Sequence, residues 1–412
     1  MKASYVYMTT GKPVTSIFNA GFISITAINF IVYLVYYLLM VIIAVVVHTN
    51  LHANLAQAGL ASGIYVIGTL IARLIIGQQL DIIGRKQSLR FGALIYLVST
   101  LAYLIIPNIG VMFAVRLVNG FAYGMTSTAT NAIVTDYIPE DKKGLGINFY
   151  GLSTSLAAAI GPFVGMILLN LTNFRFIVIV SSVLILLTTI ATLLLPIHNL
   201  ALTPERKAEL RHMTFDNLIE RKALFIAGIG FLMGFSYSSV LSFLSSYAKT
   251  IHLVSISSFF FVVYALVITF TRPMAGRIFD TRGEDYVMYP AYASLAVGLV
   301  LLGVTHSGFM LLLSGAFIGL GYGTFMSNGQ AVALKLAPNA LRVGVSLSTY
   351  FIGLDLGIGV GPFVLGDVEK LLNFRELYLL AAVIPVIAGL LYYKFYHHEQ
   401  DVAPKIDGAT QH

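Results

Sequence analysis

The sequence has no cysteine and no tryptophan, and only 10% of its 412 residues are Asp, Glu, Lys or Arg. The missing cysteines exclude disulfides, thiol nucleophiles and cysteine-ligated metal centres. Soluble domains carry about a quarter charged residues, so a water-soluble enzyme of this length is also excluded. What the chain does contain is 58% hydrophobic residues, with a mean hydropathy of +0.85. These values predict that the lipid bilayer is its main solvent.

Long runs without charge mark the membrane spans, because a charged side chain at the bilayer centre is costly. The first run, residues 13–72, is broken by a polar patch at 48–54 and therefore predicts two helices. The same reading of the whole chain predicts helices at 18–47, 55–80, 87–106, 110–136, 145–170, 175–195, 223–248, 256–279, 287–305, 308–334, 342–367 and 376–396. We therefore expect an all-α integral membrane protein with twelve transmembrane helices.

The basic residues are spread unevenly over the predicted loops. Four of the 25 Lys and Arg residues fall on one side of the membrane and nineteen on the other, while Arg73 and Arg116 fall inside helices. By the positive-inside rule, the second side, which holds both termini, is cytoplasmic. The net charge of +7 is thus interpreted as membrane orientation in a multi-pass protein of the cell membrane. No nucleic-acid partner is expected.

The second half of the sequence repeats the first. A shift of 199 residues aligns Arg73 with Arg272, Gly77 with Gly276, Asp81 with Asp280, Gly84 with Gly283, Gly120 with Gly319, Tyr123 with Tyr322 and Gly124 with Gly323. We expect two pseudo-symmetric six-helix halves at 1–195 and 223–398, a cytoplasmic linker at 196–222 and a tail at 399–412. Parallel repeats of this kind place a binding site between the halves and permit alternating access.

The segment 77–86, G-Q-Q-L-D-I-I-G-R-K, resembles the loop signature G-x-x-x-D-R-x-G-R-R/K of the major facilitator superfamily. The resemblance spans nearly the whole chain and implies the major facilitator fold. It also implies a gating loop that contains Gly77, Asp81, Gly84 and Arg85, with Asp280 in a weaker second copy. In the family this loop is implied to stabilise the outward-open state.

The chemistry of the gating loop depends on Asp81. We expect its carboxylate to face the positive N-terminal end of the helix that begins near Arg342, with Arg85 as a nearby partner. The alternative is that Asp81 and Arg85 only shape the loop. Arg73 and Arg272 lie one turn before the loop motifs and are interpreted as structural residues that reach lipid headgroups or the loop carboxylates.

Two charged residues inside predicted helices are candidates for proton coupling. Asp355 is the one carboxylate near the middle of a predicted span, so we expect it to carry the proton. Arg116, with Asn119 and Gly120, resembles the R-x-x-Q-G motif of proton-coupled members and is expected to assist. The alternatives are a packing hydrogen bond for Asp355 and a structural bracket for Arg116.

The segment that contains Gly161, Pro162 and Gly165 resembles the antiporter signature G-P-x-x-G, although Asn148 and Ala157 stand where the longer motif has glycines. The resemblance implies efflux. We expect a bend here at the interface between the halves. Ordinary packing of small residues between helices is the alternative.

Polar and aromatic residues on several helices predict the lining of a substrate cavity. Asn29, Tyr33 and Tyr37 share one helix face because they are four residues apart. The other candidates are Asn119, Tyr123, Tyr237 and Tyr322. Aromatic and amide groups suit amphiphilic organic compounds better than sugars. The alternative is that these tyrosines only pack or lie at the membrane interface.

The combined interpretation is a monomeric, proton-coupled secondary transporter that exports small amphiphilic organic compounds and resembles the twelve-span drug:proton antiporters. It is not expected to be an enzyme or to bind a cofactor, and the proton gradient is expected to drive it. ATP drive is not expected, since no phosphate-binding glycine loop is present. No metal site is expected, because His48 and His52 lack a third ligand. The alternatives are a sugar or metabolite transporter of the same fold, working by efflux or proton symport, and a membrane receptor or scaffold that does not transport.

Overall fold

The structure is a computed structural model that describes residues 16–53, 55–197, 215–257, 259–369 and 372–396. These residues form helices joined by short turns, and no strand occurs among them. Twelve of the helices are long and apolar enough to cross a membrane. The all-α membrane class predicted from the charge-free runs is therefore confirmed.

The helices divide into two sets of six spans. The first half contains α1 (Ala20–Asn50), α2 (Leu55–Ile83), α3 (Arg85–Ala102), α4 (Ile109–Val134), α5 (Lys143–Leu171) and α6 (Phe174–Leu194). The second half contains α9 (Leu224–Thr250), α11 (Phe260–Arg282), α12 (Asp285–Gly303), α13 (Gly308–Ile318), α14 (Thr324–Lys335), α15 (Val343–Glu369) and α16 (Phe374–Leu391). A π-helical turn at Gly319–Gly323 joins α13 and α14 into one span.

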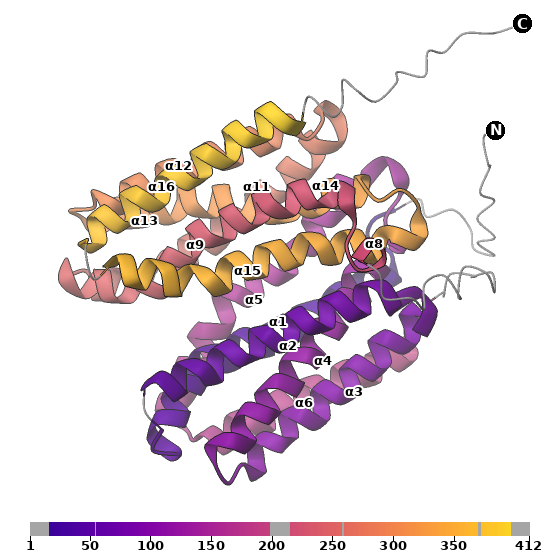
Figure 1. The fold of residues 1–412 in the computed structure, drawn as a ribbon, viewed down its shortest axis with the longest axis horizontal. Coiled ribbons are helices and arrows are strands. Elements are labelled where there is room, and N and C mark those ends of the chain that lie inside the picture. Colours follow the sequence, from indigo (N-terminus) through magenta and orange to yellow (C-terminus); the bar gives the residue numbers. More distant parts are fainter. Residues whose placement is uncertain (1–15, 54, 198–214, 258, 370–371, 397–412) are drawn as a thin grey trace, which may run out of the picture.

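The two sets form two bundles that lie side by side (Figure 1). The bundles meet where α5 packs against α11 and where α15 packs against α2. The short helix α8 (Phe215–Leu218) lies at one end of the bundles, called the linker end here. The opposite end, where α1 ends and α2 begins, is called the far end. Most of the predicted linker (198–214) and the whole predicted tail (399–412) lie outside the described residues.

Each half has its own apolar core, made of side chains that its helices turn toward one another. Asn and Ser side chains start the helices that follow the far-end turns. Asn108, Asn173, Ser307 and Asn373 each accept a hydrogen bond from a backbone N–H three residues further on, at the starts of α4, α6, α13 and α16. These caps satisfy N–H groups that have no partner within the helix, so the far-end turns stay short.

Two glycines make equivalent turns at the linker end. Gly84 joins α2 to α3 with a φ of 96°, and Gly283 joins α11 to α12 with a φ of 95°. Residues with a Cβ rarely adopt this conformation, so glycine is required at both turns. The repeat seen in the sequence is therefore also a repeat of backbone geometry.

Glycines also set how closely paired helices approach. A Cβ added at Gly353 or Gly357 of α15 would overlap the backbone of Ala227 or Phe231 on α9. Helices whose backbones approach this closely gain van der Waals contact, which is a main source of association in lipid. The glycines around Asp355 therefore hold α15 firmly against α9.

The G-P-x-x-G segment serves the same purpose within the first half. Cβ positions at Gly161 and Gly165 would lie 3.1 Å and 2.8 Å from the carbonyl oxygens of Leu34 and Leu38 on α1. The helix α5 continues through Pro162 without interruption. The expectation that this segment lies at the interface between the halves is wrong, because its small residues face α1 of the same half.

We expect Gly353→Ala to lower the free energy of unfolding by about 1–3 kcal/mol, since its methyl group overlaps a backbone carbonyl. Gly228→Ala on α9 is a matched control, because no atom lies within 4 Å of its Cβ position. That control should be neutral or should stabilise the helix by up to about 1 kcal/mol. Thermal melts followed by circular dichroism in detergent check this, and equal melting of the two variants would contradict it.

Candidate functional site

An ion pair joins the two halves near the middle of the bundle. Nε of Arg73 on α2 donates to Oδ2 of Asp355 on α15 at 2.8 Å. The Arg73 guanidinium also lies over the ring of Phe351, 4.8 Å from its centroid. The Arg73 side chain is 1% exposed and that of Asp355 is 21% exposed. The carboxylate is thus the accessible member of the pair.

This contact corrects the interpretation of Arg73 as a residue that reaches headgroups or the loop carboxylate. The face of α2 that carries Arg73 is turned toward α15, so the side chain points inward rather than along the membrane surface. Two signals in the sequence were available: its position inside a predicted span and its alignment with Arg272. Its partner is 282 residues away in the sequence, so no local pattern identifies Asp355.

Arg272 occupies the equivalent position in the second half but has no carboxylate partner. Its Nε donates to the carbonyl oxygen of Gly323 at 2.8 Å. Both terminal nitrogens of its guanidinium are buried without a hydrogen-bond partner among the described residues. The whole residue is 0% exposed, so the expectation that it reaches headgroups or Asp280 is also wrong.

Arg116 lies inside the first half, away from Asp355. Its Nε donates to the carbonyl oxygen of Ala61 at 2.8 Å, and its guanidinium lies over the ring of Tyr65 at 4.3 Å. A terminal nitrogen also contacts the Tyr103 hydroxyl at 3.4 Å. The expected cooperation of Arg116 with Asp355 is not seen in this geometry, because these contacts hold the guanidinium among α2, α4 and the end of α3.

Asn119 extends the network around Arg116. Its amide donates to the hydroxyl oxygens of Ser99 at 2.8 Å and Thr100 at 3.1 Å. Its side-chain oxygen accepts a hydrogen bond from Tyr103 at 3.3 Å. Asn119 is 0% exposed, so in this arrangement it ties α4 to α3 and does not line a cavity.

Asn29 is likewise held by neighbours in its own half. Its amide donates to the hydroxyls of Ser153 at 2.9 Å and Thr154 at 3.1 Å. Its oxygen accepts from Tyr150 at 2.8 Å and Thr130 at 3.1 Å. This side chain is fully bonded between α1, α4 and α5, so it does not offer a free group to a substrate in this arrangement.

Tyrosines from three helices stack in the first half. The ring of Tyr36 stacks on Tyr65 and Tyr123, with centroid distances of 5.2 Å and 4.6 Å. Tyr33 meets Tyr123 edge-on at 5.3 Å, and Tyr37 lies beside Tyr36 at 4.6 Å. The structure thus brings the predicted Tyr33, Tyr37 and Tyr123 together and adds Tyr36 and Tyr65.

The second half repeats this arrangement. Tyr237 stacks on Tyr322 at 3.9 Å and on Tyr264 at 5.9 Å. Tyr264 follows Tyr65 by the same offset of 199 residues that relates Tyr322 to Tyr123. The repeat was therefore a signal that could have identified Tyr65 and Tyr264 from the sequence. Stacked phenol rings present flat apolar faces together with hydroxyl groups.

At the linker end, Asp280 closes one contact between the halves. Its two carboxylate oxygens accept hydrogen bonds from the backbone N–H groups of Gly144 and Leu145, both at 2.7 Å. These groups are in the first turn of α5, where the helix dipole favours a negative charge. The predicted contact of a loop carboxylate with a helix N-terminus is thus made by Asp280, whereas it was expected of Asp81.

Arg85 makes a second contact between the halves at the linker end. It binds Asp81 at 3.1 Å and Asp136 at 2.8 Å, and it donates to the carbonyl oxygen of Ala340 at 3.2 Å. Ala340 precedes α15 in the other half. Asp81 and Arg85 are therefore neighbours, as the loop motif suggested, but the residue that reaches across the halves is Arg85.

The repeat equivalent of Arg85 and Asp136 is a pair of reversed charge. An offset of 199 aligns them with Glu284 and Lys335, which form an ion pair at 2.7 Å. Burial raises the pKa of Glu284, but bonds from Lys335 and from the Tyr396 hydroxyl outweigh it, so the pKa lies below its ordinary value. Glu284 is consequently ionised near neutral pH and holds the turn between α11 and α12.

Two amide pairs join the halves between the linker-end contacts and the central ion pair. Asn148 donates to Asn328 at 2.9 Å, and Gln330 donates to Asn131 at 3.3 Å. Asn148 and Asn328 are both fully buried. With the contacts of Asp280 and Arg85, these pairs hold the halves together at the linker end.

Comparison with known proteins places this architecture in a family. The model of the Major Facilitator Superfamily matches residues 25–346 and 285–411. The chain belongs to the major facilitator superfamily. It is accordingly a transporter of that superfamily, with the linker end held closed in this structure.

Its similarity to individual proteins is distant but extends over most of their length. An uncharacterized MFS-type transporter of Methanocaldococcus jannaschii is 20% identical over 83% of this chain and 89% of its own. One of Burkholderia mallei is 24% identical over 88% of each chain. The human organic anion transporter MFSD10 has a TM-score of 0.70 and 16% identity over 90% of this chain and 98% of its own. This last similarity shows the fold alone.

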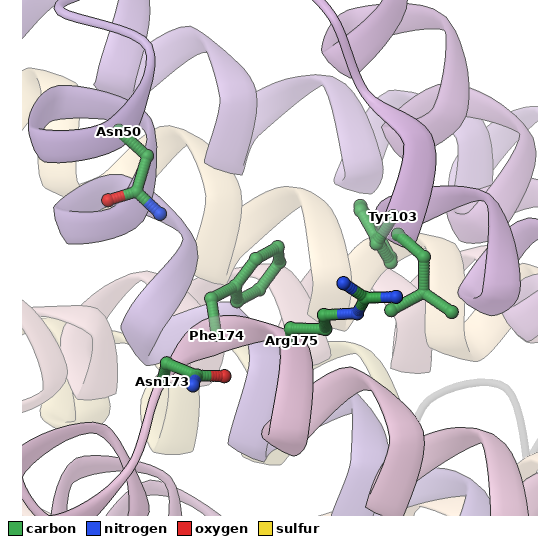
Figure 2. A pocket seen from close by; sticks show the side chains of 6 residues that line it. Asn50, Tyr103, Asn173, Phe174 and Arg175 are labelled. Carbon is green, nitrogen blue, oxygen red and sulfur yellow. The ribbon is translucent and has the colours of Figure 1, made fainter.

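A hollow of about 360 Å³ lies at the far end of the first half of the transporter (Figure 2). It is lined by Asn50, Tyr103, Leu104, Asn173, Phe174 and Arg175. None of these is a predicted site residue, so this hollow is distinct from the central ion pair. Among the described residues, no group of three His, Asp or Glu side chains is placed to hold a metal ion.

We expect Asp280→Ala to shift the transporter toward states that are open at the linker end. The variant loses two charge-assisted hydrogen bonds, each worth about 1.5–3 kcal/mol, which corresponds to a shift of about tenfold or more. Because the chain has no cysteine, spin labels can be attached at Gln87→Cys and Thr281→Cys, which are exposed positions on the two halves. Double electron–electron resonance should then show a longer distance between the two spin labels.

The control for this measurement is Asp141→Asn, which removes an exposed carboxylate near the same turn. This control should leave the label distances unchanged. Identical distance distributions in Asp280→Ala and the unsubstituted transporter would contradict a latch at Asp280.

Proposed function

We propose that this transporter is proton-coupled and exports small amphiphilic organic compounds by alternating access, with Asp355 as the proton carrier. The observation that carries the proposal is the ion pair of Asp355 with Arg73, because it joins the two halves through a group that a proton neutralises. A buried ion pair is costly to break by removing one charge, since the other is left without compensation. The protonation state of Asp355 is thereby coupled to the contact between α2 and α15.

The cycle follows from this contact. In the arrangement described, ionised Asp355 accepts the Arg73 hydrogen bond and holds α15 against α2. A proton bound at the carboxylate removes its charge and weakens the attraction to Arg73. The halves then lose one contact, which favours their rocking about the site between them. The partial exposure of the carboxylate supports its role as the group that receives the proton.

The proposed substrate class is supported by the tyrosine clusters. Six stacked rings, three in each half, lie on the helices around the central ion pair: Tyr36, Tyr65, Tyr123, Tyr237, Tyr264 and Tyr322. Such surfaces suit flat organic molecules. Sugars need many free hydrogen-bonding groups, and Asn29 and Asn119 are already engaged within the first half. These observations favour an amphiphile over a sugar or another hydroxyl-rich metabolite.

Export and orientation are further parts of the proposal. The resemblance of 161–165 to the antiporter signature supports export, and the distribution of basic residues supports a cytoplasmic linker end in the cell membrane. We also propose that the transporter acts as a monomer without a cofactor and is driven by the proton gradient, since each half supplies one member of the central pair.

The coupling is tested with purified transporter in liposomes under an imposed pH gradient, while lumenal pH is followed as cationic, neutral and anionic amphiphiles are added. We expect substrate-dependent proton flux that is lost, by about a hundredfold or to background, in Asp355→Asn, because an amide cannot take up the proton. Asp141→Asn, an exposed carboxylate at the linker end, should keep the flux.

Flux that survives in Asp355→Asn would remove Asp355 as the proton carrier. Binding of an amphiphile without flux in the unsubstituted transporter would instead support a receptor. Arg73→Gln provides a further check, because loss of the ion pair should leave substrate movement but reduce its dependence on the pH gradient.

The orientation is tested by cysteine labelling in intact cells. Lys249→Cys at the far end and Arg282→Cys at the linker end are both exposed positions of the second half. A membrane-impermeant maleimide added outside should label the first and spare the second, and both should react after the cells are opened. The reverse pattern would place the termini outside.

A further inference from the structure

Both halves carry an arginine at the equivalent position, but only Arg73 pairs with a carboxylate among the described residues. Arg73 and Arg272 align at an offset of 199 residues, and the Nε of each donates one hydrogen bond. After the single inserted residue that aligns Gly161 with Gly361, the counterpart of Asp355 in the first half is Ser155. Ser155 has no charge, so the first half lacks a carboxylate that would pair with Arg272 as Asp355 pairs with Arg73.

Arg272 is therefore a buried cation without a carboxylate partner among the described residues. The residue is 0% exposed, and only its Nε is bonded, to the carbonyl oxygen of Gly323. The two terminal nitrogens, which offer four N–H donors in a planar fork, have no partner among the described residues. A buried guanidinium without a counter-charge destabilises the protein, and that cost is removed when an anion binds.

Groups next to Arg272 suit an anionic ligand. The Ser327 hydroxyl and a terminal nitrogen of Arg272 both lie next to the Cβ position of Gly151 on α5, so they are close to each other. The Ser327 and Tyr322 hydroxyls are also buried without partners. No carboxylate bonds to this group of donors in the part of the chain described. Several donors therefore converge without an acceptor.

We propose that Arg272 binds the anionic group of the transported compound, an organic anion with a carboxylate or sulfonate on an aromatic body. A guanidinium binds either group through two parallel hydrogen bonds. The stacked rings of Tyr237, Tyr264 and Tyr322 supply a flat surface for the aromatic part. This inference names the substrate class of the proposed function and rests on it.

The position of Arg272 explains when the anion enters. It lies on α11 eight residues before Asp280, about 12 Å along the helix from the linker-end latch. Its guanidinium faces Gly151 on α5 of the other half. Rocking that separates α5 from α11 at the linker end therefore uncovers Arg272 toward the side proposed to be cytoplasmic, where an exported compound is loaded.

Equilibrium binding tests the inference without a pH gradient, so its result does not depend on proton coupling. Calorimetric titration of the transporter in lipid nanodiscs uses benzoate, 1-naphthoate and naphthalene-2-sulfonate, each compared with its neutral amide. At least one anion should bind about tenfold or more tightly than its amide, since one charge-assisted pair is lost in the amide. If no anion binds more tightly than its amide, the inference is wrong.

Variants then assign the effect to Arg272. Arg272→Gln should remove the preference for the anion, Arg272→Lys should keep part of it, and Arg277→Gln, an exposed charge on the same helix, should keep all of it. A preference that persists in Arg272→Gln would overturn the inference, even if Asp355→Asn still abolishes proton flux.

Ser155→Asp gives a test that does not depend on removing the arginine. It places a carboxylate where Asp355 stands in the other half, so it should pair with Arg272, raise the melting temperature and abolish the binding of all three anions. A variant that is folded and still binds the anions as tightly as the unsubstituted transporter would also overturn the inference.

Discussion

The cost of a charge in the lipid bilayer governs how this protein is organised around its centre. Arg73 and Asp355 are each expensive in that medium, and each is tolerated because the other lies 2.8 Å away on the opposite half. Their bond is therefore a condition for the contact of α2 with α15, and under the proposed function a proton on Asp355 would weaken it. The same two residues thus meet a structural requirement and carry the proposed proton coupling.

The two halves share one frame but distribute charge differently over it. Glycine turns, tyrosine stacks and arginines recur at an offset of 199 residues, because each half solves the same packing problem. The charges diverge: Arg85 with Asp136 in one half corresponds to Glu284 with Lys335 in the other. Asp355 likewise corresponds to Ser155. The repeat therefore explains the architecture that the halves share, whereas the positions at which the halves differ carry the charged pairs.

Rigid packing within each half makes the contacts between the halves decisive. Glycines bring α15 against α9 and α5 against α1 so closely that neither pair can slide without backbone clashes. Motion is thereby directed to the surface between the bundles, where Asp280, Arg85 and the buried amide pairs hold the linker end. These polar bonds can be exchanged for water when that end opens, whereas the glycine contacts have no such replacement.

The sequence by itself determined the number of spans, the division into halves and the position of the loop motif, because these depend on local hydropathy and spacing. It also identified Asp355 as the exceptional carboxylate, since depth in a span follows from counting residues. The tertiary structure alone decided the partners. Arg73 joins Asp355, Arg116 remains with Ala61, and Gly161 faces α1, because the rotation of each helix is set by packing against distant segments. No pattern within one helix contains that information.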